Sequence, residues 1–174
     1  SFVRTMVKPD ALFSWLFNDP IYGRQPFYYF VELELSWKSD DRVKQRTRSY
    51  IDFLLSLTWK KTKSGLELPY FPAVLFLFPE KEGATARTAL ANMHRHRKAL
   101  LGAMTAMERN LARWEQVFNC GFACPDLCDG VLDRDSTASP VNDAIWYDLY
   151  RPEQGPRPLR DIVPSAVKEK LEAR

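Results

Sequence analysis

At 174 residues, with 45% hydrophobic and 27% charged residues, the chain can bury one sizeable core and is too hydrophobic for a disordered polypeptide. No apolar run approaches the roughly 20 residues that a membrane-spanning helix needs, and no signal peptide opens the sequence, so we expect a cytoplasmic protein without membrane partners. The formal net charge of +3 allows a polyanionic partner but does not demand one.

The first third of the chain predicts two extended segments followed by a helix. Residues 2–17 favour strand or hairpin structure, residues 18–26 concentrate turn formers, and the aromatic segment 27–35 predicts a strand. Ser39, followed by two aspartates, is a favourable helix start, and the helix is expected to end near residue 56. The expected core residues are Phe30, Val31, Leu33 and Leu35 of the strand and Val43, Thr47, Tyr50, Ile51, Leu54 and Leu55 of the helix.

The remainder predicts one more buried strand and a helical region. Residues 72–78 form a continuous apolar run, typical of a central strand with helices on both of its faces. Residues 83–118 favour one or two helices, residues 119–140 are loop-like, and residues 143–149 suggest a last strand. This order predicts a single α/β domain, a mixed central sheet flanked by helices, with a core of about 1–118 and a C-terminal extension of about 119–174.

Two carboxylates mark the aromatic strand. Glu32 and Glu34 are two residues apart and therefore point to the same face, where like charges resist ionisation. A divalent cation, Mg²⁺ or Mn²⁺, is the simplest compensation, and Asp10 would complete the ligand set if the fold brought it alongside. Such a site can activate water and stabilise a leaving oxygen. Periodicity alone equally allows a half-exposed strand with two solvated acids.

Four short motifs carry a family resemblance: VKPDALF at 7–13, FVELE at 30–34, RTRSY at 46–50 and FPAVLF at 71–76. They resemble the PD-(D/E)XK nuclease superfamily and, more narrowly, the replication-relaxation family of plasmids and integrative elements. The resemblance covers roughly residues 7–90. It implies a restriction-endonuclease-like core that acts on DNA, and an upstream winged-helix DNA-binding domain that this chain would lack.

The sequence departs from the superfamily pattern at its lysine. The position two residues after the strand acid is Glu34, and the family's helix lysine is replaced by Arg46. A guanidinium stabilises phosphate charge but does not act as a base. Lys44, on the same helix, and Lys38, just past the strand, are candidates for a migrated lysine, although surface lysines are the commoner case.

Cysteines and histidines give weaker signals. Cys120, Cys124 and Cys128 lack the tighter CxxC pair of a structural zinc site, so we expect reduced thiols; a zinc site with His94 or His96 as the fourth ligand is the minority alternative. His94 and His96 belong to the basic segment 93–98, which predicts a basic helix surface, with DNA phosphate as a minority partner. Most tryptophans are expected in the core, with base stacking by Trp37 or Trp59 as the alternative.

Two functional hypotheses follow. The first is a Mg²⁺-dependent DNA endonuclease or nickase of a plasmid or mobile element, in which Asp10, Glu32 and Glu34 hold the metal while Lys44 and Arg46 face the scissile phosphate. The second is a non-catalytic factor on a degenerate nuclease fold, which binds DNA or recruits other replication or transfer proteins. A structural domain with acids on a solvated strand is a third possibility.

Overall fold

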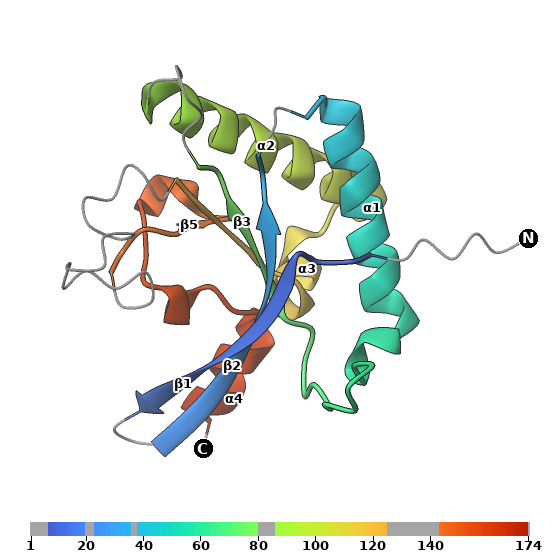
Figure 1. Ribbon diagram of the computed structural model, residues 1–174, viewed down its shortest axis with the longest axis vertical. Coiled ribbons are helices and arrows are strands. Elements are labelled where there is room, and N and C mark those ends of the chain that lie inside the picture. The colour runs from blue at the N-terminus through green and yellow to red at the C-terminus, as the bar shows by residue number, and fades with distance from the viewer. Residues whose placement is uncertain (1–6, 20–22, 36–37, 80–85, 125–142, 174) are drawn as a thin grey trace, which may run out of the picture.

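A mixed five-stranded sheet forms the centre of the molecule (Figure 1). The computed structural model describes residues 7–19, 23–35, 38–79, 86–124 and 143–173. The strands are β1 (Ala11–Asp19), β2 (Gly23–Leu33), β3 (Ala73–Leu77), β4 (Cys120–Ala123) and β5 (Tyr147–Asp148), and their order in the sheet follows the chain. β2, β3 and β4 are parallel to one another, whereas the two edge strands run antiparallel to their neighbours. This arrangement confirms the predicted α/β class with a mixed sheet.

The helices are α1 (Asp40–Ser56), α2 (Ala86–Met107), α3 (Leu111–Val117) and α4 (Ser165–Glu172), with 3-10 turns at Thr58–Lys60 (η1), Pro152–Gln154 (η3) and Leu159–Asp161 (η4). α1 and α2 pack together on one side of the sheet, and α4 lies on the other (Figure 1). Parallel strands need such crossover helices, and the layers on both faces keep the central strands dry.

The apolar run at β3 is buried on both faces, as its sequence predicts. Val74 and Phe76 join the cluster beneath α1 and α2, while Ala73 and Leu75 join a second cluster with C-terminal residues such as Ile162. Alternation along the strand divides these side chains between the two layers. One strand thereby connects both halves of the core.

Helix α1 begins where the sequence predicts. The Ser39 hydroxyl accepts a hydrogen bond from the Arg42 amide at 3.4 Å, and the helix ends at Leu57, whose φ of 57° is left-handed. Its buried face contains Val43, Thr47, Tyr50, Ile51 and Leu54. Leu55, also expected in the core, is 66% exposed, because a position 100° further around the axis than Leu54 turns away from the sheet.

The prediction of which residues of segment 27–35 lie in the core is wrong in part. Phe30 is buried and Val31 half-buried, but Leu33 and Leu35 are 41% and 61% exposed. Even-numbered residues of this segment point toward α1, so the odd-numbered ones point to the opposite face. The two leucines therefore lie on the face that α1 does not cover.

The segment expected to be loop-like from residue 119 begins with a buried strand. All four residues of β4 are buried, and β5 lies within the predicted range 143–149. A Cβ on Gly121 would lie 2.9 Å from Ile162 Cγ2 and 3.0 Å from Leu75 Cδ2, which shows how tightly the C-terminal layer packs on this strand. The core therefore extends well past residue 118.

Candidate functional site

Three carboxylates meet at one end of the sheet. Asp10 immediately precedes β1, and its Oδ2 accepts a hydrogen bond from the Leu33 amide at 2.8 Å, so the antiparallel hairpin brings it beside the end of β2. Glu32 lies within β2. Glu34 follows the strand, and its amide donates to the Leu77 carbonyl at 2.8 Å, which continues the pairing with β3. The hairpin register thus gathers acids that are more than 20 residues apart in sequence.

The two glutamates are buried and fully engaged by neighbouring donors. Arg46 donates from Nη2 to Glu32 Oε2 and from Nη1 to Glu34 Oε1, the latter at 2.6 Å. Tyr50 donates its hydroxyl to Glu32 Oε1, and Lys38 Nζ lies 2.6 Å from Glu34 Oε2. The side chains of Glu32 and Glu34 are each only 1% exposed. Each of the four carboxylate oxygens therefore accepts at least one hydrogen bond. We call these five side chains the Arg46 cluster.

Burial dominates the electrostatics of the Arg46 cluster. It raises the pKa of Glu32, the negative charges of Asp10 and Glu34 raise this pKa further, and the Tyr50 hydroxyl and the Arg46 guanidinium oppose the rise. Burial and the charge of Glu32 also raise the pKa of Tyr50 well above its ordinary value, so the phenol donates a proton rather than ionises. A buried acid pair of this kind requires a cation, and Arg46 supplies it.

The residues as they are arranged do not fit a divalent metal. Among the described residues, no group of three or more His, Cys, Asp or Glu side chains is placed to hold a metal ion. The guanidinium of Arg46 bridges Glu32 and Glu34, and Asp10 accepts from a backbone amide. Mg²⁺ and Mn²⁺ need hard oxygen ligands with available lone pairs, which Arg46 and Lys38 engage here.

Of the two predicted helix cations, the structure brings one to the acids. Arg46 contacts Glu32 and Glu34, whereas the Nζ of Lys44 lies 3.9 Å from Asp41 Oδ1 and its side chain is 51% exposed. Two residues along a helix are about 200° apart, so Lys44 and Arg46 cannot share a face. The prediction that Lys44 faces the site is therefore wrong.

Two members of the Arg46 cluster, Lys38 and Tyr50, do not belong to the predicted catalytic set. The sequence indicates Lys38 only as a candidate for a migrated lysine, and it indicates Tyr50 only as a core residue. Tyr50 follows Arg46 by four residues, which places both on one face of α1. That spacing is a signal available in the sequence, because a buried tyrosine needs a partner for its hydroxyl.

The cysteines described by the structure are buried thiols. Cys120 lies in β4, and Cys124 Sγ lies 3.7 Å from Met93 Sδ beneath α2. Burial raises the pKa of the Cys120 thiol well above its ordinary value, which keeps it protonated. Cys128 lies outside the described residues.

His96 belongs to the core, not to a basic surface. It is 4% exposed, and its ring lies within 6.3 Å, between centroids, of the rings of Phe76, Phe78 and Phe122. Burial, followed by the charges of Lys38, Arg46 and Arg95, lowers its pKa to about 3, so the ring is neutral. His94 is half-buried against Tyr147. The prediction of a basic helix surface is therefore wrong for His96, and its alternative, a contact with DNA phosphate, is wrong as well.

Trp59 is 7% exposed, and its indole nitrogen donates to the Leu54 carbonyl at 2.9 Å. It therefore belongs to the core, as the sequence predicts for most tryptophans, and Trp37 lies outside the described residues.

No helix of the described chain is long and apolar enough to span a bilayer. Comparison with family models, with curated proteins and with solved structures gives no significant match. The resemblance to the replication-relaxation family accordingly remains a prediction from the four motifs.

Proposed function

We propose that this protein binds DNA without cutting it, as a factor in the replication or transfer of a plasmid or mobile element. The observation that carries the proposal is the location of its positive charge. Residues 40–63 contain seven Lys or Arg and three Asp, a net charge of +4, whereas the whole chain has +3. The other residues together contribute no net positive charge.

This basic segment has the exposure that phosphate contacts require. Arg42, Lys44 and Arg48 are exposed on α1, and the loop after it exposes Lys60, Lys61 and Lys63. α1 and that loop lie along one side of the molecule (Figure 1). Exposed lysines and arginines displace condensed counterions from DNA and so provide affinity without base recognition.

The Arg46 cluster supports binding without cleavage. Its glutamates are neutralised by Arg46 and Lys38 within the protein, so they offer no free ligand set to a metal. The cluster then serves as a buried ionic link between β2 and α1, and it orients the helix that carries the basic side chains. Glu34 at the position of the superfamily's strand lysine and Arg46 at the position of the family's helix lysine also remove the usual candidates for a base.

Binding is tested by fluorescence anisotropy of a labelled DNA duplex over a range of salt concentrations. The double variant Lys44→Gln/Arg48→Gln should bind roughly tenfold more weakly, and the slope of log K against log salt should fall by about 1 to 2. Arg160→Gln is the matched control, because Arg160 is exposed in η4 beside the opposite layer. Equal losses in both variants, or no DNA binding by the wild type, would contradict the proposal.

Metal-dependent cleavage is the second candidate, favoured by one observation. Asp10 lies close enough to Glu32 to raise its pKa, so the three acids of the nuclease hypothesis do converge at one end of the sheet. A metal could bind there only after Arg46 and Lys38 had left the carboxylates.

Nicking of supercoiled plasmid in Mg²⁺, Mn²⁺ or chelator separates the two candidates. If the protein only binds DNA, neither the wild type nor Glu32→Gln, which keeps the shape of the side chain, should nick the plasmid under any of the three conditions. Metal-dependent nicking by the wild type that disappears in Glu32→Gln would establish the nuclease instead. The same assay on a protein extended by any upstream domain completes the test.

A further inference from the structure

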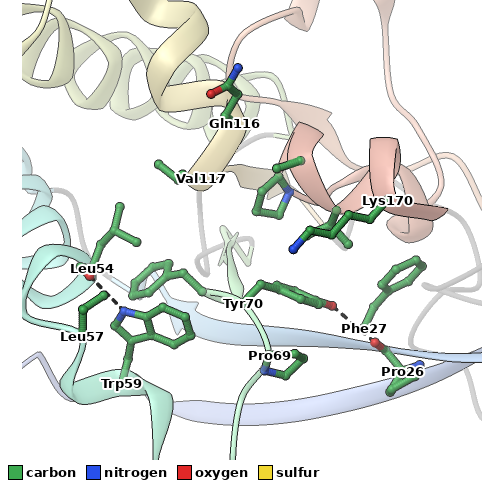
Figure 2. Close-up of a pocket in the computed structure, with 14 residues that line it drawn as sticks. Pro26, Phe27, Leu54, Leu57, Trp59, Pro69, Tyr70, Gln116, Val117 and Lys170 are labelled. Carbon is green, nitrogen blue, oxygen red and sulfur yellow. Dashed lines mark hydrogen bonds between the residues drawn. The ribbon is translucent and has the colours of Figure 1, made fainter. Parts of the chain in front are cut away.

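An apolar cavity of about 470 Å³ opens between the start of β2 and the end of α1 (Figure 2). Its walls come from the start of β2, the end of α1 with η1, residues 69–71, the end of α3, and α4. Its volume falls within the range of about 300–1,000 Å³ that is typical of small-molecule sites. Five segments far apart in sequence converge on it, so only the complete fold produces it.

The aromatic walls have their polar atoms already paired. Trp59 donates its indole N–H to the Leu54 carbonyl at 2.9 Å, and the Tyr70 hydroxyl donates to the Pro26 carbonyl at 3.4 Å while it accepts from the Tyr28 amide at 3.0 Å (Figure 2). These groups therefore present apolar ring surface to an occupant rather than hydrogen-bonding atoms. An occupant would be held mainly through burial of its own apolar surface.

Apolar side chains at the edge of the cavity are left in contact with water. Leu57 is 53% exposed and Val117 is 44% exposed, and both line the cavity. Covering these side chains and the ring surfaces would be favourable, because it removes apolar surface from water.

The charge at the wall of the cavity is positive. Among the described residues that line it, Lys170 is the charged one, and Gln116 adds an uncharged amide. In Figure 2 the Lys170 side chain runs from α4 toward the middle of the cavity, whereas the Gln116 amide points away from it. A cation beside an apolar, aromatic surface is complementary to a molecule with an apolar body and an anionic group.

We propose that this cavity binds a small anionic amphiphile, such as a medium-chain carboxylate. The hydrocarbon body packs against Trp59, Phe71 and Val117, and the carboxylate pairs with Lys170. Leu54, Leu57 and Trp59 of the basic segment 40–63 line the cavity, but binding in the cavity requires none of the exposed lysines and arginines of that segment.

Calorimetric titration with three probes of equal chain length tests the proposal: decanoate, decan-1-ol and decylammonium, each below its aggregation threshold. Decanoate should bind about tenfold more tightly than decan-1-ol, and decylammonium should bind most weakly. In Lys170→Glu, decanoate should lose about tenfold or more in affinity and decylammonium should gain.

Lys168→Glu is the matched control, since it makes the same charge change on the same helix at a residue that does not line the cavity. Circular dichroism checks that both variants remain folded. Failure of all three probes to bind the wild type would overturn the proposal. So would equal affinity for decanoate and decan-1-ol, or equal effects of the two lysine substitutions.

Discussion

Replacing Arg46 with methionine removes the cation that bridges two buried carboxylates and keeps the apolar stem of the side chain. Breaking a buried ion pair from one side typically costs about 3–5 kcal/mol, because the remaining charge stays buried without compensation. Tyr50 still donates to Glu32 and Lys38 still pairs with Glu34, and the Arg46 side chain is 28% exposed. We therefore expect the lower end, a loss of about 3 kcal/mol in unfolding free energy at pH 7.5.

The loss should depend on pH with a defined sign. Burial already raises the pKa of Glu32, and removal of the Arg46 charge raises it further, so the folded state takes up a proton more readily than the unfolded chain. The stability cost of Arg46→Met should therefore shrink as the pH falls through the folded pKa of Glu32 and be largest above it. Urea unfolding followed by circular dichroism at pH 7.5 and pH 5 measures this difference.

The double variant Arg46→Met/Glu32→Gln is the control, because it removes the uncompensated charge together with its partner. It should recover at least half of the stability that Arg46→Met loses at pH 7.5. A cost below about 1 kcal/mol for Arg46→Met would refute the argument, since that is the value of an exposed pair. A cost that is the same at both pH values would refute the assigned role of Glu32.

The remaining predictions concern the core and one helix terminus. His96→Phe should make the unfolding free energy less sensitive to acid. The pKa of His96 is about 3 in the folded state, so the histidine destabilises the folded state as the pH falls from about 6.5 toward 3. The difference between the urea midpoints at pH 7 and pH 4 should therefore be smaller in the variant than in the wild type. Gly121→Ala should destabilise by about 1–3 kcal/mol, because the new Cβ would lie 2.9 Å from a side-chain carbon. Gly102→Ala, on helix α2 with nothing within 4 Å of the new Cβ, should stabilise the protein by roughly 0.5–1 kcal/mol. Thermal unfolding checks both glycine variants, because the midpoint should fall in Gly121→Ala and rise in Gly102→Ala. Ser39→Ala should cost about 1 kcal/mol in urea unfolding through loss of the α1 cap, and no change would show that the 3.4 Å hydrogen bond is not formed in solution.

Local patterns in the sequence determined several parts of the fold. Ser39 and the two aspartates after it mark the start of α1, because a capping hydroxyl and acids at a helix N-terminus act over a few residues. The apolar run at 72–78 predicts β3, because a strand covered on both faces has no polar side. The spacing of Glu32 and Glu34 placed both on one face for the same local reason.

Tertiary structure decided which groups meet. Alternation puts Glu32 and Glu34 on one side of β2, but the position of α1 across that face is what brings Arg46 to both of them. Likewise Leu33 and Leu35 look like core residues in the sequence, and they are exposed because no local pattern specifies how far a covering layer extends. β4 has only four residues and was expected as loop, and its pairing with β3 depends on the C-terminal layer that buries Gly121. Packing between segments far apart in the chain thus determined how the acidic centre is neutralised, which side-chain periodicity alone cannot specify.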